Sequence, residues 1–264
     1  MKIKLVTDAS ALMPKKFMED EKIAYFESIL IIDGESKREI TELNRDEFIN
    51  SLSTADPYPT TSQMMAQDAI EVYEQAIKDG YDEILYIGLT PLISSQMNVA
   101  RLAAKRIKGK IKITPYDTDL TCGSQGAMAY RALELLKQGK NVEEITAHLD
   151  NLKEEIYTVG MTGDTISLFK TGKVKRGSVK GIMVSLFNMK PIAEVNTEEG
   201  FIGIGAAFSE KSAMKKMIKE IAIRTHPDKE YDLFMADASN PELMDWYVSE
   251  IKKVRKIKQT FYWE

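Results

Sequence analysis

Short apolar segments alternate with longer stretches in which apolar residues recur every three or four positions through the first part of the chain. Strand-like apolar runs cover residues 2–9, 23–32, 83–89 and 112–118, and helical patterns cover 44–52, 66–77, 98–107, 125–139 and 143–156. Strands that alternate with helices in this way form parallel sheets through crossover connections. The pattern predicts an α/β fold for residues 1–155, mainly a parallel sheet with flanking helices.

Polar signals mark where these helices and turns should begin. A capping residue followed three positions later by Glu or Gln is typical of a helix start, and this spacing occurs at Asn44 and Glu47, at Thr60 and Gln63, and at Asn141 and Glu144. We therefore expect helices to start at all three places. Asp33-Gly34 predicts a turn after residues 23–32, and Gly139 predicts a helix end.

The pattern changes after about residue 155. Strand-like segments cover 157–163, 189–196, 201–208, 231–239 and 256–264, and Glu198-Glu199-Gly200 between two of them predicts a hairpin. Two helical patterns surround Met217 and Tyr247, and Asn240-Pro241 marks the start of the second. We expect a mixed α/β C-terminal domain over 156–264, beside an N-terminal α/β domain over 1–155.

The composition of the chain excludes several classes of function. The 264 residues are 44% hydrophobic and 29% charged, with a net charge of −4, which disfavours nucleic-acid binding. Cys122 is the single cysteine, so a disulfide framework or a cysteine-rich zinc site is excluded. The uncharged stretch 85–100 is too short and polar to span a membrane, and the first residues do not resemble a signal peptide. We expect a cytoplasmic protein without a metal or cofactor.

The sequence lacks several common catalytic and cofactor-binding motifs. The glycines of residues 203–205 have no third glycine at the spacing of a dinucleotide site, and no nucleophile-elbow motif occurs. His148 and His226 are expected to be solvated surface histidines. Asp8, Asp117 and Asp237 each follow a strand, where α/β proteins place ligands. Each one alone is better explained by capping or turn formation, and together they slightly favour a site at that edge of the sheet.

Two hydroxyl clusters remain, Thr60-Thr61-Ser62 and Ser94-Ser95, each before an expected helix. Free backbone N–H groups and the positive end of the helix dipole favour an anion at such a position. For either cluster alone, simple N-capping is the better explanation. From the residues alone, we expect an α/β protein with a candidate small-anion site.

The chain resembles the DegV family at these residues and in most of its length. Residues 60–63 (TTSQ) resemble the family signature T-S-Q-P-S, and residues 7–17 (TDASALMPKKF) resemble T-D-S-S-A-D-L-P. Residues 89–104 align without gaps on I-S-S-x-L-S-G-T-Y-Q-S-A-R-L-A-A, so that Ser94 occupies the serine of S-G-T. Residues 116–126, 167–177 and 186–195 resemble three further motifs in the same order.

The resemblance implies a bacterial two-domain protein that holds one long-chain fatty acid in a tunnel between its lobes. It assigns the carboxylate to Thr61 and Ser94, and we include the neighbouring Ser62 and Ser95 in the expected site. Fourteen methionines suit an adaptable tunnel lining. The family also implies a candidate partner, an ATP-dependent fatty-acid kinase to which the protein would present the acyl group. We therefore expect a binding protein, at most a substrate-presenting subunit, with no catalytic residues of its own.

Departures from the family pattern argue against kinase coupling. Phe208 aligns with an expected arginine, the C-terminal H-x-G-P-G segment has no counterpart before Glu264, and the glycine of S-G-T is replaced by Ser95. One alternative is an α/β enzyme or sensor acting on a small polar anionic metabolite at Asp8 and Asp117. A second alternative is a structural remnant whose tunnel is filled by side chains.

Overall fold

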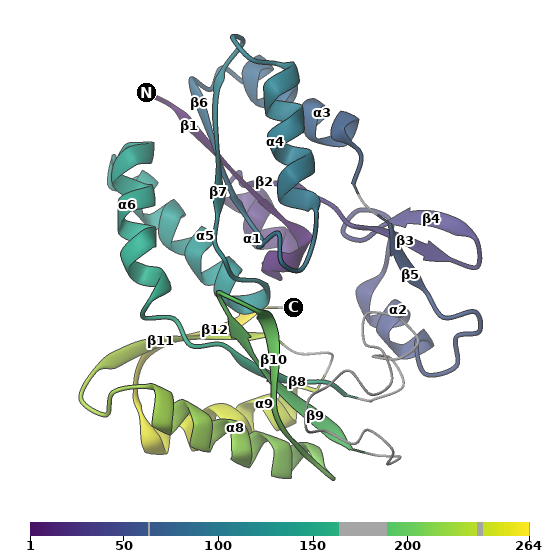
Figure 1. Ribbon diagram of the computed structural model, residues 1–264, viewed down its shortest axis with the longest axis vertical. Coiled ribbons are helices and arrows are strands. Elements are labelled where there is room, and N and C mark those ends of the chain that lie inside the picture. The colour runs from purple at the N-terminus through teal and green to yellow at the C-terminus, as the bar shows by residue number, and fades with distance from the viewer. Residues whose placement is uncertain (63, 164–188, 237–239, 264) are drawn as a thin grey trace.

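The computed structural model describes residues 1–62, 64–163, 189–236 and 240–263. Asp237 and the basic, glycine-punctuated segment that carries one of the family motifs lie outside the described residues. Two lobes lie one above the other, with the C-terminal lobe below in Figure 1. A small sheet with a short helix projects from the side of the N-terminal lobe (Figure 1).

The N-terminal lobe is built on a parallel sheet, as the alternating pattern predicts. Its strand order is β2-β1-β6-β7, with all neighbours parallel. The strands are β1 (Ile3–Asp8), β2 (Ala24–Phe26), β6 (Glu83–Gly88) and β7 (Lys112–Asp117). The helices are η1 (Ala9–Ala11), α1 (Lys15–Asp20), α3 (Ala66–Lys78), α4 (Gln96–Arg106), α5 (Cys122–Lys137) and α6 (Val142–Lys153).

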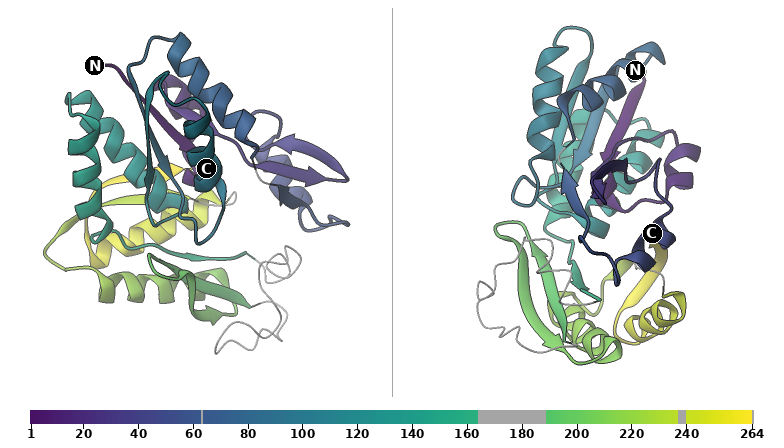
Figure 2. Two further views of the ribbon diagram at one scale, coloured as in Figure 1. Left: turned by 45° about the horizontal axis from the view of Figure 1, so that its top comes forward. Right: turned by 90° about the vertical axis from the view of Figure 1, so that its right-hand side faces the viewer.

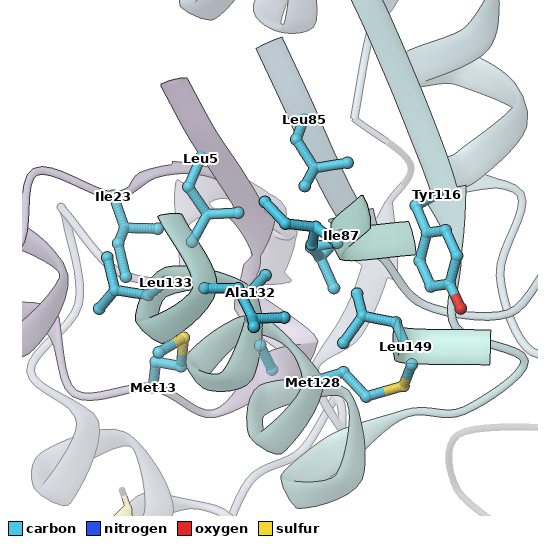
Figure 3. Packing of buried hydrophobic residues seen from close by; sticks show 14 of the residues in the cluster. Leu5, Met13, Ile23, Leu85, Ile87, Tyr116, Met128, Ala132, Leu133 and Leu149 are labelled. Carbon is cyan, nitrogen blue, oxygen red and sulfur yellow. The ribbon is translucent and has the colours of Figure 1, made fainter. Parts of the chain in front are cut away.

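Alternate side chains of the sheet enter two separate cores. Leu5, Leu85 and Ile87 face α1, α5 and α6, and Figure 3 shows them packed around Met128, Ala132 and Leu149. Val6 and Tyr86 point the other way, against α3 and α4. Because successive residues of a strand point to opposite faces, a sheet covered on both sides needs continuous apolar strands. Strand β6, which lies between β1 and β7, is buried at all six positions.

The segment 23–32 is two strands rather than the one that its apolar run suggests. Strand β2 ends at Phe26, and β3 (Ile29–Ile32) belongs to a separate antiparallel sheet in the order β4-β3-β5. The Glu27 carboxylate lies between them and accepts hydrogen bonds from the backbone N–H groups of Ile40 and Thr41 at 2.9 and 2.8 Å. These bonds hold the segment that follows β4 against Glu27. Beyond this point a small sheet projects from the lobe together with α2 (Arg45–Ser51), and its strands are β3, β4 (Glu35–Arg38) and β5 (Thr60–Ser62).

In the described part of the C-terminal lobe, two small sheets pack on two helices, as Figure 2 shows from two further directions. One sheet has the order β10-β9-β8, formed by β8 (Val159–Met161), β9 (Lys190–Asn196) and β10 (Gly200–Ala207). The other pairs β11 (Glu230–Ala236) with β12 (Lys256–Trp263) in parallel. The two helices are α8 (Glu210–Arg224) and α9 (Pro241–Val254). The predicted hairpin at Gly200 is confirmed by the antiparallel pairing of β9 with β10.

The last strand returns to the first lobe. Trp263 is 6% exposed and belongs to the same core as Leu5 and Met128. It lies against α5, where a Cβ atom at Gly126 would come within 2.0 Å of the Trp263 ring. Phe234 and Phe261 stack beside it with ring centroids 4.5 Å apart. The lobes therefore share an aromatic junction, and the domain division near residue 155 stays a prediction.

Candidate functional site

A large cavity lies between α5 and α6 of the first lobe and the sheets and helices of the second. Its volume is about 1670 Å³, above the roughly 300–1,000 Å³ usual for small-molecule pockets. Five methionines from four different elements line it: Met161, Met214, Met217, Met235 and Met244. Methionine side chains are flexible and polarizable, so such a lining adapts to an apolar ligand of variable shape.

One face of α5 forms the first-lobe wall of this cavity. Gly123, Ala127 and Tyr130 line it, at the spacing that places residues on one side of a helix. Gly126 lies beside this face of the same helix, where it faces Trp263 and the Ala11 carbonyl. Small residues at the start of α5 thus serve two purposes, because they leave space for the cavity and let the last strand approach closely.

Thr61 and Ser62 do not lie at a helix start, so that prediction is wrong. They are exposed residues of β5, and Thr61 pairs with Leu30 of β3 in the projecting sheet. Helix α3 starts at Ala66, where the Asp68 carboxylate accepts a hydrogen bond from the Met65 N–H at 2.9 Å. Strand pairing determines the conformation of the threonine segment, and a carboxylate further along the chain starts the helix.

Ser94 and Ser95 precede α4, as predicted. The half-buried Ser94 hydroxyl accepts a hydrogen bond from the Gln96 N–H at 3.3 Å, so it already helps to start the helix. The preceding residue, Ile93, touches the other lobe, because its Cγ1 lies 3.3 Å from where a Cβ of Gly200 would stand. Gly200 has a φ of 80°, which a residue with a side chain adopts only with strain.

None of the four predicted head-group residues is among the described residues that line the cavity. Ser94 follows Ile93, which packs against Gly200, and Phe201, the residue after Gly200, lines the cavity. No hydrogen bond between described residues joins Thr61 to Ser94. Their assignment to the carboxylate stays a prediction.

Arg45 at the start of α2 is a cavity residue that the sequence analysis missed. Its side chain is half-buried, and no carboxylate of the described residues lies within 4.0 Å of its guanidinium group. Two other cavity-lining cations have carboxylate partners: Lys229 lies 3.4 Å from Glu155, and Arg131 lies 2.9 Å from Glu134. Only knowledge of the fold could single out Arg45, because it occupies an ordinary first position of a helix.

The two histidines differ from each other. His226 is exposed, as expected. His148 is half-buried on the cavity wall, where its Nε2 accepts a hydrogen bond from the Arg131 Nε at 3.1 Å, so the expectation of a solvated histidine is wrong for it. In the described part of the chain, no group of three or more His, Cys, Asp or Glu side chains is placed to hold a metal ion.

Asp8 is a fully enclosed carboxylate at the carboxyl end of β1. Its Oδ2 accepts hydrogen bonds from the Tyr86 hydroxyl at 2.7 Å and from the Leu89 N–H at 3.3 Å, and its Oδ1 accepts one from the Ser10 N–H at 3.0 Å. Burial raises the pKa of Asp8, and these donors oppose the rise. With 1% exposure and both oxygens engaged, Asp8 connects β1, β6 and η1 and presents no open face to a substrate.

Gly88 makes the Asp8 network sterically feasible. A Cβ atom there would lie 2.5 Å from the Tyr86 hydroxyl oxygen and 2.6 Å from the Met97 Cε. The Tyr86 ring therefore crosses Gly88 to reach Asp8. Asp117 is level with Gly88 on the next strand, so about 10 Å of sheet separates it from Asp8 at the usual strand spacing, and the Tyr86 ring occupies part of that gap.

Asp117 is half-buried and belongs to a local turn. Its Oδ1 accepts a hydrogen bond from the Asp119 N–H at 3.0 Å, and its Oδ2 lies 3.9 Å from the Arg101 guanidinium. Burial is the largest cause of its raised pKa. The two aspartates that the sequence suggested as a site for a small polar anionic metabolite thus have separate structural partners and are not assembled around one substrate.

Comparison with known proteins gives this arrangement a family. The family model described as "Uncharacterised protein, DegV family" matches residues 2–262. A DegV domain-containing protein of Listeria innocua is 29% identical over 91% of this chain and 85% of its own length. A fatty-acid-binding DegV family protein from Thermus thermophilus superimposes with a TM-score of 0.86 at 23% identity, over 100% of this chain and 92% of that one.

A stearic acid-binding protein from Eubacterium ventriosum superimposes with a TM-score of 0.85 at 16% identity, over 97% of this chain and 89% of that one. At these identities the structural likenesses establish a shared fold, and they confirm the predicted α/β architecture. No helix among the described residues is long and apolar enough to cross a membrane. The match of the family model over nearly the whole sequence shows that the chain belongs to the DegV family.

Proposed function

We propose that this protein binds one long-chain fatty acid, with the acyl chain in the cavity between the lobes and the carboxylate near its rim. The observation that carries the proposal is the methionine-lined cavity of about 1670 Å³ in a DegV-family fold. Relatives of the same fold from Thermus thermophilus and Eubacterium ventriosum are described as fatty-acid-binding, which supports it. We also propose that the protein is cytoplasmic, as the sequence analysis expects.

Burial of the acyl chain supplies the affinity. About fourteen methylenes at ~0.8 kcal/mol each give a gross gain near 11 kcal/mol. Burial of an ionised carboxylate opposes binding by several kcal/mol unless donors meet it. Hydrogen bonds to a charged group return about 1.5–3 kcal/mol each. Chain affinity and head-group placement are therefore separable, and each can be altered without the other.

The proposed head-group contacts combine the resemblance with the structure. Thr61 and Ser94, with the adjacent Ser62 and Ser95, keep the carboxylate role that the family alignment suggests. Arg45 adds a half-buried positive charge on the cavity wall. In this proposal the hydroxyls donate hydrogen bonds to the carboxylate and Arg45 supplies a counter-charge, while the acyl chain lies among the methionines of the cavity.

We further propose that the role is binding rather than catalysis. The enclosed Asp8 and the turn-bound Asp117 support this, because neither offers a free carboxylate to a polar substrate. Transfer of the bound acyl group to an ATP-dependent kinase has support from the family resemblance alone. The residue aligned with the expected arginine is Phe208, 71% exposed after the end of β10, so we include no phosphoryl-transfer step.

Substitution of both hydroxyls, Thr61→Val with Ser94→Ala, should weaken binding of palmitate by about tenfold or more, from the loss of hydrogen bonds to a charged group. Palmitate methyl ester, which is uncharged, should lose much less. Calorimetric titration of delipidated wild-type and variant proteins measures both. Wild type should take up close to one equivalent of palmitate.

Thr54→Val is a matched control, because Thr54 is an exposed hydroxyl residue of the first lobe that does not line the cavity. Its affinity for palmitate should equal that of wild type. Equal losses for acid and ester in the double variant would show that Thr61 and Ser94 shape the fold instead of holding the head group.

A further inference from the structure

The small projecting sheet has little apolar contact to hold it in place. It consists of β3, β4 and β5, and α2 accompanies it (Figure 1). Among residues 28–62, Leu30 and Pro59 alone are buried, and Leu30 belongs to none of the three hydrophobic cores of the described residues. Yet this part of the chain carries Thr61 and Arg45, two of the residues proposed for the carboxylate. Its placement therefore decides whether they reach the ligand.

Two carboxylates tie the projecting sheet to the rest of the lobe. Glu27 holds the segment that follows β4, as described above. Asp68, in the first turn of α3, accepts a hydrogen bond from the Arg38 Nη2 of β4 at 2.8 Å and another from the Met65 N–H at 2.9 Å. The Asp68 side chain is 17% exposed, so water only partly screens its ion pair with Arg38. Hydrogen bonds between ionised partners are stronger than neutral ones. Asp68 thus joins β4 to the start of α3.

Strand pairing connects this anchor to Thr61. Ile29 of β3 pairs with Arg38 on one side and with Ser62 on the other. The next residue of β3, Leu30, pairs with Thr61. Thr61 is therefore one row of the sheet away from the row that Asp68 holds. Because backbone hydrogen bonds keep neighbouring strands about 4.8 Å apart, a displacement of β4 also displaces β5.

We propose that Asp68 is a positioning residue for fatty-acid binding, and that its bond to Arg38 holds the projecting sheet where Thr61 can donate to the carboxylate. Neither Asp68 nor Arg38 is among the described residues that line the cavity, so both act through Thr61 and its neighbours. This inference rests on the proposed function, and it concerns the head group alone, because the acyl chain lies among residues of other elements.

The test measures the affinities of palmitate and of its methyl ester for delipidated wild type and Arg38→Met by calorimetry. Arg38→Met should weaken palmitate binding about threefold or more, a part of what full loss of a hydrogen bond to a charged group entails. Binding of the uncharged ester should weaken by less than twofold. The ratio of the two affinities does not depend on the fraction of folded protein, so a general loss of stability would not change it.

A double-mutant cycle shows whether the effect passes through Thr61. Arg38→Met should weaken palmitate binding clearly less in a Thr61→Val background than in wild type, because the two residues then act on one contact. Arg38→Lys keeps a cation for Asp68 and should retain most of the wild-type ratio of acid to ester affinity. If Arg38→Met does not fold, Asp68→Asn repeats the measurement, since it removes the ion pair but keeps an acceptor for the Met65 N–H.

Lys110→Met is the matched control. It breaks a 2.9 Å ion pair with Glu74 on the same helix α3, and it leaves the Arg38 bond to Asp68 intact. Both palmitate and ester should bind to it as to wild type. Equal losses for acid and ester in Arg38→Met, or an equal effect in both backgrounds of the cycle, would overturn this inference and leave the proposed binding intact. No palmitate binding by wild type would overturn both.

Discussion

Lengthening the acyl chain from ten to sixteen carbons should tighten binding by about three orders of magnitude. Six added methylenes, at ~0.8 kcal/mol each, contribute about 5 kcal/mol when the cavity buries them fully. The cavity has room for this, because its lining continues from α5 to the methionines of α8 and α9. Competition binding with a homologous series of saturated acids, each below its aggregation limit, gives the slope.

A variant that narrows the cavity should flatten this dependence. Ala127 lies on the cavity face of α5, so Ala127→Phe should weaken palmitate binding more than decanoate binding. Ala147→Phe, on an exposed position of α6 outside the cavity lining, should match wild type. Affinity that does not change with chain length would mean that the acyl chain is not buried in this cavity.

Gly126→Ala should destabilise the protein by about 2 kcal/mol, although the same change in an open helix normally stabilises it. An added Cβ would stand 2.0 Å from the Trp263 ring and 2.3 Å from the Ala11 carbonyl oxygen. The ring can rotate away only by leaving the shared core, and the backbone carbonyl cannot move cheaply. The free energy of unfolding, from urea denaturation, measures the loss.

Gly123→Ala in the same helix is the matched control, because the nearest atom to its added Cβ is the Phe234 carbonyl oxygen at 3.7 Å. It should be neutral or slightly stabilising. Gly126→Ala should also weaken fatty-acid binding, since the junction holds α5 against the second lobe and α5 forms one wall of the cavity. Unfolding free energies that are equal for the two variants would contradict this account of the junction.

The fold was largely predictable because its signals are local. The Asn141 side chain and Glu144 cap α6 reciprocally, as their spacing predicts. Asp33 and Gly34 both have positive φ at the turn between β3 and β4, which is why an aspartate-glycine pair occurs there. Each of these features depends on residues within one turn of each other, so the sequence displays them directly.

Long-range pairing explains the errors. Thr60 and Gln63 have the spacing of a capping box, but pairing of β5 with β3 extends the segment instead. The apolar run 23–32 is divided by contacts of Glu27 with Thr41, fourteen positions away, which no local pattern reveals. In both places, tertiary contacts override a short-range preference.

The cavity could not be located from the sequence, because its walls come from distant segments. Arg45, His148 and Tyr247 lie on three different helices, and none belongs to a recognisable motif. Methionine content suggested an adaptable lining, yet only the fold shows which methionines face the cavity. The hydroxyl clusters were visible as motifs, but their position relative to the cavity depends on packing between lobes.

The most direct test of the central claim is mass spectrometry of lipid extracted from the protein after purification from a bacterial host. The proposed binding in the methionine-lined cavity predicts close to one long-chain fatty acid per chain, because the apolar part of the cavity wall is unfavourable to leave in contact with water. An extract without fatty acid, from protein that also fails to take up added oleate or palmitate, would contradict the account.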